Sequence, residues 1–510
     1  MREVELKFGL TDAAAGAVES ALRRHGAMAA VLTSHYWDTP ERHLARAGLS
    51  LRLRNTGARW EQTLKGAGPT PAERLEDSVP RPGTWDDTGP SPELALHAAD
   101  PAAARLLDKA LPRRKGARAP APALGLAYTS RIERLALTLV LADAEVEVAF
   151  DRGAIEAGER SLPVREVEIE LKRGDVAALL ALARANVDAH GMWLSTLTKS
   201  ARGSRLALAG EPEAAKATAP RLDRSSNGAA LFRAIVASCI EQVLANASPL
   251  AAADCADEVV HQLRVGIRRL RTASRELGAW RGALGVEWEA PMAELFHAFG
   301  AYRDRKTVAA RIEQRLAAVG SPNPALQAPV ASASGDPVDP VSMARRSSFQ
   351  HALLDVLAFL MLPAERSDAA QRPDELGVDD IAPACEIGAR LDKLHARLQR
   401  DARRFEELDP SARHAVRKRL KRLRYLAELV GPLYERARVR RFLRALEPAQ
   451  DELGRLMDLV VAARLAREVV EGGQTRGWFN VGWLQAQVPR AIERSGRALR
   501  KTADAKPFWD

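Results

Sequence analysis

The 510 residues carry 76 Lys and Arg against 66 Asp and Glu, a net charge of +10, and this basic balance favours an anionic partner such as nucleic acid, polyphosphate or an anionic surface. The length suits roughly three domains of about 150 residues each. Three scattered cysteines exclude a disulfide framework and a cysteine-based zinc site. We expect neither a signal peptide nor a membrane span, and we therefore predict a cytoplasmic protein without membrane partners.

Residues 1–210 have the alternating pattern of β-strands. The opening MREVELKFGL places Glu3, Glu5 and Lys7 on one face and apolar residues on the other. This charged face is either the solvated side of an ordinary sheet or the lining of a barrel whose outer wall packs against helices. Further strands are predicted at 49–54, 60–66, 135–141, 144–151 and 165–172, with helices near 11–25 and 174–187.

The later strands favour the barrel, because their charged residues also fall on one alternating face and carry both signs. The residues on this face are Arg52, Arg54, Lys65, Glu145, Glu147, Asp151, Glu166, Glu168 and Glu170. An antiparallel barrel of about eight strands can enclose a small ligand. We therefore predict that mixed charges line a closed lumen.

The two kinds of charge in this lining indicate a phosphate ligand with a metal. Arg and Lys side chains clamp phosphate oxygens, whereas carboxylates repel a phosphate chain unless a divalent cation lies between them. Mg²⁺ is typically held by one or two carboxylates together with substrate phosphates and water. The lining therefore predicts a metal–triphosphate site.

Six motifs follow one another along the first 205 residues. They are the ExExK start, YWDTPERHLARAGLSLRLR at 36–54, TLKG within 60–66, VEVAFDRGAI at 146–155, PVREVEIELKRGD at 163–175 and LTKSARGSRL at 197–206. In this order they resemble a CYTH domain of the triphosphate tunnel metalloenzymes. The resemblance implies an eight-stranded antiparallel β tunnel that binds triphosphate with Mg²⁺ or Mn²⁺. The metal ligands that it implies are Glu3, Glu5, Glu166, Glu168 and Glu170, and the phosphate contacts are Lys7, Arg52, Arg54, Lys65, Arg134 and Lys199.

The same resemblance implies hydrolysis of inorganic tripolyphosphate to pyrophosphate and phosphate, with Glu3, Glu5, Lys7 and Lys65 as catalytic residues. The family also contains adenylate cyclases and thiamine triphosphatases, so an organic triphosphate is an alternative substrate. A non-catalytic polyphosphate-binding scaffold is the alternative function. The intact carboxylates favour the enzyme, because an anion receptor has no use for so many of them without a metal.

The chain beyond residue 210 is helical and basic. Residues 1–210 hold 29 basic against 27 acidic groups, which leaves +8 of the net +10 to the rest. The polar stretch 211–226 contains two prolines and predicts a linker, and low complexity within 319–345 predicts a disordered loop. We therefore expect a tunnel domain over 1–210 and a helical domain over 227–505, an α+β protein overall.

An internal repeat organises the helical half. VHQLRVGIRRLRTASREL at 260–277 aligns with RHAVRKRLKRLRYLAELV at 413–430, and FGAYRDRKTVAAR at 299–311 aligns with LGRLMDLVVAARL at 453–465, always at an offset of 153 or 154 residues. Two copies, at about 227–318 and 378–470, predict an all-α bundle with pseudo-twofold symmetry.

Each copy carries a basic stripe, because positions i, i+3, i+7 and i+10 lie within about 80° around a helix. Ridge 1 is His261, Arg264, Arg268 and Arg271, and ridge 2 is His414, Arg417, Lys421 and Arg424. A solvated helix face is the alternative reading of either ridge. Like charges at this spacing destabilise a helix by a few tenths of a kcal/mol per pair, so two crowded ridges favour a bound anion.

With these ridges, residues 227–505 resemble a CHAD domain. The resemblance implies that inorganic polyphosphate binds along a basic groove between the repeats, with Arg269, Arg303 and Arg422 as further contacts, and it suggests association with polyphosphate granules. Met457 stands where the first copy has Arg303, so the second copy is expected to contact fewer phosphates. Nucleic acid is a weaker option, because the ridges lack the interleaved aromatic residues that stack on bases.

Overall fold

The computed structural model describes residues 4–56, 59–67, 74–83, 89–111, 123–210, 213–253, 256–326, 339–362 and 383–509. The chain divides into two compact units, residues 1–213 with 251–256 and residues 214–250 with 257–510. We call them the sheet unit and the helical unit. The predicted boundaries of the linker and of the two repeats stay predictions.

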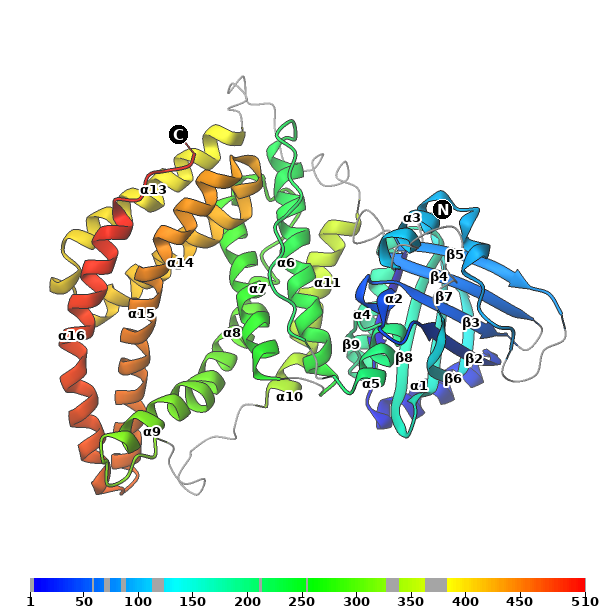
Figure 1. Ribbon diagram of the computed structural model, residues 1–510, viewed down its shortest axis with the longest axis horizontal. Helices are drawn as coiled ribbons and strands as arrows, with labels where there is room; N and C mark the ends of the chain where they lie inside the picture. The colour runs from blue at the N-terminus through cyan, green and yellow to red at the C-terminus, as the bar shows by residue number, and fades with distance from the viewer. Residues whose placement is uncertain are drawn as a thin grey trace. The chain divides into compact units, whose positions relative to one another are not determined.

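The sheet unit is built on one antiparallel sheet of nine strands, in the order β5-β4-β3-β2-β6-β7-β8-β1-β9 (Figure 1). The strands are β1 (Val4–Gly9), β2 (Met28–Asp38), β3 (Ser50–Asn55), β4 (Trp60–Ala67), β5 (Arg74–Arg81), β6 (Gly125–Val140), β7 (Ala144–Ala157), β8 (Arg160–Gly174) and β9 (Trp193–Leu194). Among the described residues β5 and β9 each pair with one neighbour only, so the sheet is not closed. The predicted closed barrel of eight strands is therefore wrong in strand number and in closure.

Five helices accompany the sheet: α1 (Asp12–Arg24), α2 (His43–Arg46), α3 (Pro101–Ala110), α4 (Val176–His190) and α5 (Lys199–Leu208). Local sequence fixes where the long ones begin. Thr11 caps α1 by accepting a hydrogen bond from the Ala14 amide at 3.3 Å, and Asp175 caps α4 by accepting from the Ala177 amide at 2.9 Å. Both helices contact the sheet.

Alternation along β8 separates the core from the charged face. Val167 and Ile169 are fully buried, whereas Glu166, Glu168 and Glu170 occupy the alternate positions of the strand. Because side chains of a strand point to opposite faces in turn, the three glutamates share the face opposite the apolar core. The alternation predicted for this strand is present.

Most predicted strands are found, but several are longer than their periodic core. The strand predicted at 135–141 is part of β6, which begins at Gly125, and the one predicted at 144–151 extends in β7 to Ala157. Strands β2, β5 and β9 and helices α3 and α5 were not predicted. These elements are short or weakly alternating, so their pairing with neighbours defines them.

The helical unit contains eleven described segments of α-helix or π-helix. They are α6 (Gly228–Ala251), α7 (Asp257–Glu276), α8 (Glu289–Arg303), a π-helical turn (Asp304–Val308), α9 (Ala309–Ala318), α10 (Pro340–Arg345), α11 (Ser347–Met361), α13 (Pro383–Arg403), α14 (Pro410–Val430), α15 (Arg436–Glu471) and α16 (Trp478–Ala503). Ridge 1 lies on α7 and ridge 2 on α14, and these two helices contact each other. Helix α10 occupies the end of the predicted loop, of which residues 327–338 lie outside the described chain. The pseudo-twofold symmetry stays a prediction.

Helix α6 is long and apolar enough to cross a membrane by length and composition, with a mean hydropathy of 1.5 over a window that is 56% buried. A helix of this length and composition was not predicted from the sequence. The core helix of a soluble protein passes the same test. In α6, the buried Ser238 donates to the Thr218 carbonyl, Gln242 to the Gln262 side chain and Asn246 to the Ala215 carbonyl. All three partners belong to the helical unit.

Candidate functional site

Strand register brings acidic and basic side chains together on the charged face of the sheet. Arg134 of β6 lies opposite Asp151 of β7, which in turn lies opposite Glu166 of β8. On the other side of β8, Glu168 lies opposite Lys7 of β1. Four neighbouring strands therefore contribute to one charged cluster.

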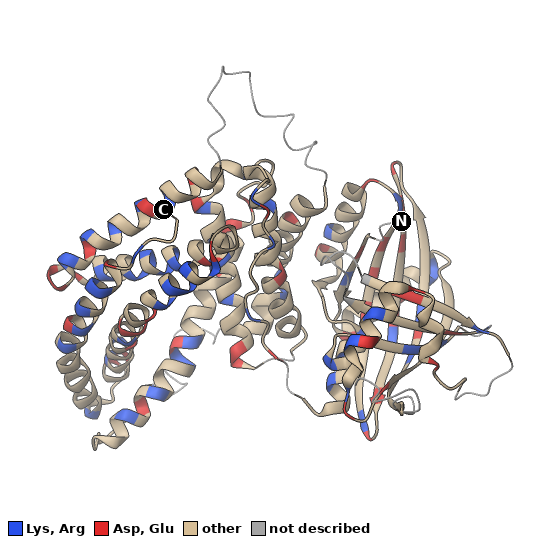
Figure 2. Ribbon diagram, turned by 45° about the horizontal axis from the view of Figure 1, so that its top comes forward, with Lys and Arg blue, Asp and Glu red and all other residues tan. Residues whose placement is uncertain are grey.

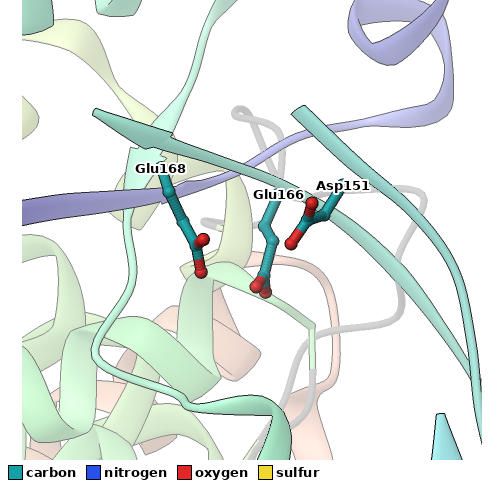
Figure 3. A group of neighbouring side chains, drawn as sticks. All are labelled: Asp151, Glu166 and Glu168. Carbon is teal, nitrogen blue, oxygen red and sulfur yellow. The ribbon is translucent and has the colours of Figure 1, made fainter. Parts of the chain in front are cut away.

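Three carboxylates form the acidic part of this cluster. Asp151, Glu166 and Glu168 each offer one oxygen, and these oxygens all lie within 4.8 Å of one another. Asp151 is fully buried and Glu166 is 2% exposed. Figure 3 shows that the three side chains point toward a common space from two adjacent strands. Carboxylates gathered this closely need positive charge among them.

Side chains of the protein supply that charge. Arg134 donates to both oxygens of Asp151, at 2.6 and 2.7 Å, and also pairs with Glu168 at 2.5 Å. The Lys199 ammonium lies 2.6 Å from Asp151 and 3.3 Å from Glu168, and it also pairs with Glu166. Lys7 lies 2.9 Å from Glu168. Each carboxylate is thus bound by at least two cations of the same unit.

These contacts keep the cluster ionised. Burial by itself would raise the pKa of Glu168, but Lys199, Lys7 and Arg134 outweigh it and hold that pKa well below the ordinary 4.5. The pKa of Asp151 is lowered in the same way, against its burial, by Arg134 and Lys199. The pKa values of Arg134 and Lys199 are raised by these carboxylates despite burial. Both signs are therefore present at neutral pH.

Helix α5 brings Lys199 to the cluster. Thr198 caps the helix by accepting from the Ala201 amide at 3.0 Å, so Lys199 is the first helical residue. A Cβ on Gly203 would come within 2.2 Å of the Tyr128 ring, and the Tyr128 hydroxyl donates to the Ser200 carbonyl at 2.9 Å. This close approach to β6 also aims Arg202 at Glu166, with which it pairs.

A second basic group lies on the strands β3 and β4. Arg52 is 7% exposed, donates to Thr63 at 3.3 Å, and has a buried Nε without a hydrogen-bond partner. Arg54 donates to Ser34 at 3.2 Å. Burial and then Arg52 lower the pKa of Arg54 to about 10, and Arg134 and Asp151 also act on it. The second group is therefore electrostatically coupled to the cluster and is incompletely neutralised.

The group of three carboxylates includes none of the other predicted residues that the structure describes. Glu3 is outside the described residues. Glu5 is exposed and lies opposite Glu170, which binds Lys172 at 2.7 Å. Lys65 pairs with Glu76 at 2.6 Å, and burial followed by Arg52 lowers its pKa. Glu5, Glu170 and Lys65 do not belong to the cluster of Asp151, Glu166 and Glu168. The roles predicted for them and for Glu3 stay predictions.

Two residues of the cluster were not among the predicted site residues. Asp151 was placed on the charged face but not named as a ligand, although it shares the parity of Glu145 and Glu147 on the same strand. Arg202 was missed altogether. The sequence could have indicated Arg202, because it follows Lys199 by three residues and this spacing puts both side chains on one face of α5.

In the helical unit the two ridges converge on Lys421. Burial, followed by Arg268 and Arg417, lowers the pKa of Lys421 from 10.5 to about 6, and Arg303 and Arg264 act in the same direction. Burial and then Arg268 lower the pKa of Arg264 to about 10. The Arg268 guanidinium donates to the Tyr425 hydroxyl at 3.0 Å. Residues of both sequence copies thus form one basic surface, which we call the ridge surface.

Three cations of the ridge surface lack carboxylate partners in the described part of the chain. Among the described residues no carboxylate lies within ion-pair distance of Arg264, Arg417 or Lys421, and the buried Nε atoms of both arginines have no hydrogen-bond partner. Burial and then Arg303 lower the pKa of His261, and burial followed by Lys418 lowers that of His414. Both imidazoles are therefore neutral at pH 7. Figure 2 shows Lys and Arg along the helices of this unit.

Three predicted contacts are engaged elsewhere. Arg269 is 1% exposed and donates to Gln242 at 2.8 Å and to a backbone carbonyl, so in this structure it lies in the core, and its role as a polyphosphate contact stays a prediction. Arg422 pairs with Glu276 at 3.3 Å. Arg424 pairs with Glu428 at 2.6 Å. The side chain of Arg271 is partly buried.

The fold and its two charged sites define a two-domain protein, in which an antiparallel sheet carries a mixed carboxylate and cation cluster and a helical unit carries a basic surface. The sequence matches the CYTH domain over residues 1–204 and the CHAD domain over residues 234–467. The chain is therefore a CYTH–CHAD protein, with the two domains in that order.

Comparisons with known proteins give partial matches. The chain is 25% identical to an inorganic triphosphatase from Haemophilus influenzae over 179 residues, which are 34% of this chain and 45% of the relative, so it spans less than half of that protein's length. The CHAD domain from Ricinus communis covers 58% of this chain and 98% of its own, with 24% identity and a TM-score of 0.46. A putative adenylyl cyclase from Hippeastrum, described as having a dominant triphosphatase activity, covers 39% and 92%, with 18% identity and a TM-score of 0.29.

Proposed function

We propose that the sheet unit is a metal-dependent hydrolase that cleaves inorganic tripolyphosphate into pyrophosphate and phosphate. The observation that carries the proposal is the cluster of Asp151, Glu166 and Glu168, to which the half-buried Arg54 is close enough to interact electrostatically, together with the buried Arg52, whose Nε has no hydrogen-bond partner. The similarity to a protein named inorganic triphosphatase supports the choice of substrate. The domain match to CYTH supports the class of enzyme.

The three carboxylates fit a hard divalent cation. They offer only oxygen ligands, which Mg²⁺ and Mn²⁺ prefer, and their oxygens lie within 4.8 Å of one another. Such an ion supplies charge neutralisation and an activated water when it is bound. Asp151, Glu166 and Glu168 would hold it, with Glu3, Glu5 and Glu170 as the further ligands that the CYTH resemblance implies.

The basic side chains would bind and orient the phosphates. Arg54 and Arg52 present guanidinium groups on the same face as the carboxylates, and a guanidinium binds two phosphate oxygens at once. Arg134, Lys7 and Lys199 already donate to carboxylate oxygens, so they would contact a phosphoryl group that lies beside the carboxylates. Lys65 extends the basic group along β4.

The reaction needs one water and no covalent enzyme intermediate. The water oxygen bonds to the terminal phosphorus while the bridging P–O bond breaks, and the electron pair of that bond leaves with pyrophosphate. The water proton passes to solvent or to a phosphate oxygen. The arginines and lysines stabilise the charge on the transferred group and on the leaving group, which is the main source of rate in phosphoryl transfer.

Phosphate release from tripolyphosphate, ATP and thiamine triphosphate, with and without Mg²⁺ or Mn²⁺, tests the proposal. We expect release from tripolyphosphate to be the fastest, to need the metal, and to disappear in Glu168→Gln. Glu133→Gln is the matched control, because Glu133 is an exposed carboxylate on β6. Preference for ATP or thiamine triphosphate would assign an organic substrate, and no release from any substrate would leave a non-catalytic scaffold.

For the helical unit we propose binding of inorganic polyphosphate at the ridge surface. Arg264, Arg417 and Lys421 are partly buried cations that pair with no carboxylate among the described residues, and such crowding is relieved by a polyanion. Polyphosphate should displace single-stranded DNA at equal phosphate concentration. Arg264→Gln with Arg417→Gln should weaken binding, whereas the exposed pair Arg467→Gln and Arg476→Gln should not. A preference for DNA would contradict the proposal.

A further inference from the structure

Helix α16 carries a basic stripe that lies beyond the part of the chain matched to the CHAD domain. Arg490, Arg494, Arg497 and Lys501 follow one another at spacings of four, three and four residues, which places them on one face of the helix. The opposite face packs into the unit through Leu484, Leu499 and other buried residues. Crowded like charges on one face destabilise the helix itself, as they do on the ridges.

The stripe faces α15 across a groove of about 910 Å³. The two helices lie side by side (Figure 1) and run antiparallel, since Arg494 pairs with Glu452 at 3.2 Å and the Thr502 hydroxyl donates to the Ala445 carbonyl at 2.8 Å. The groove lining consists of Arg444, Glu447, Pro448, Asp451, Glu452, Arg455, Arg494, Arg497, Ala498, Arg500 and Lys501. It shares no residue with either ridge.

The lining has an excess of positive charge. Six cations and three carboxylates leave three positive charges in the groove. Glu452 forms ion pairs with Arg455 and Arg494. Arg500 forms an ion pair at 3.1 Å with Glu406, which lies outside the groove lining. In the described part of the chain no carboxylate pairs with Arg444, Arg497 or Lys501.

The chemistry of the lining selects the ligand. Five of the six cations are arginines, whose forked donors bind phosphate oxygens in pairs. Pro448 and Ala498 are the two uncharged lining residues, so the groove offers no aromatic ring for a nucleobase. A ligand with closely spaced negative charges suits the excess of arginines best.

We propose that the groove between α15 and α16 is a second binding site, for a short linear phosphate oligomer, separate from the ridge surface. This site does not depend on the ridges binding polyphosphate. Arg444, Arg497 and Lys501 would donate to phosphate oxygens, while Arg494 and Arg455, already held by Glu452, would line the path.

Binding of short-chain inorganic polyphosphate to the full chain tests this site. A protein whose ridge surface is disabled by Arg264→Gln and Arg268→Gln should still bind short-chain polyphosphate. Adding Arg497→Gln and Lys501→Gln to this protein should weaken the binding about tenfold or more, because two charge-assisted hydrogen bonds are lost. The control pair, Arg467→Gln and Arg476→Gln, removes the same charge from exposed positions at the other end of α15 and α16 and should leave binding unchanged.

Stoichiometry gives a second measurement in the chain with intact ridges. The unaltered protein should bind one more short oligomer per chain than the Arg497→Gln, Lys501→Gln protein. Equal weakening by the groove pair and the control pair, or an unchanged number of bound oligomers in the Arg497→Gln, Lys501→Gln protein, would overturn the proposal. Groove-dependent binding of poly-L-glutamate in place of polyphosphate would instead assign an acidic protein segment. Failure of the ridge variants to affect binding would count against the ridge surface and leave this site standing.

Discussion

Replacement of Lys421 by arginine should abolish a proton uptake that accompanies polyphosphate binding. In the ligand-free protein, burial followed by Arg268 and Arg417 lowers the pKa of Lys421 to about 6. At pH 7, one unit above this pKa, about a tenth of the lysine is protonated. A polyanion at the ridge surface favours the ammonium form, so binding should draw about 0.9 proton from solution at pH 7.

The sign of the pH dependence follows from the same linkage. Because the ligand prefers protonated Lys421, affinity is flat below pH 6 and falls by up to about tenfold per pH unit above it, until the pKa of the complex is reached. Arginine stays charged throughout this range. The Lys421→Arg protein should therefore match the unaltered protein near pH 6 and bind more tightly than it at pH 8.

Calorimetric titration with polyphosphate in two buffers of different ionisation enthalpy measures the proton uptake. The two ridge histidines, whose pKa values are lowered by burial first, are the other groups that titrate near this range. A protein with His261→Gln and His414→Gln is the control and should retain an uptake of about 0.9 proton if Lys421 is its source. Retention of the uptake in Lys421→Arg, or its loss in the histidine variant, would refute the reasoning.

Three further changes separate the roles assigned to single residues. Glu168→Gln should lower the free energy of unfolding by about 3 kcal/mol, because it removes the carboxylate partner of Lys7, Arg134 and Lys199. It should also weaken Mn²⁺ binding in a calorimetric titration, and unchanged Mn²⁺ affinity would contradict the assignment of Glu168 as a metal ligand. Arg54→Gln should lower the turnover of tripolyphosphate by about a hundredfold, whereas Arg131→Gln, on the exposed face of β6, should leave it unchanged, and equal losses would show that the effect is not local. Arg269→Gln should destabilise the helical unit by about 3 kcal/mol in chemical denaturation, since it leaves buried partners without their donor, yet leave the polyphosphate affinity of the folded protein unaltered.

The sequence carried much of the candidate site because the period of each element is local. In a strand, alternate residues share a face whatever the strand pairs with, so Glu166 and Glu168 were assigned to one face correctly. In a helix, the 3.6-residue period likewise placed Arg264 and Arg268 on one stripe. The domain assignment depended on the same kind of local motif, repeated in a fixed order.

The tertiary structure decided what depends on pairing and packing. Register between β6, β7 and β8 brought Arg134 into contact with Asp151 and Glu168 and placed Asp151 opposite Glu166, and no period within one strand contains that register. The number of strands and the open edges depended on whether β5 and β9 found partners. Packing around α7 turned Arg269 into the core, and the meeting of α7 with α14 lowered the pKa of Lys421. Local geometry thus fixed which side chains share a face, whereas contacts between distant segments fixed which faces meet.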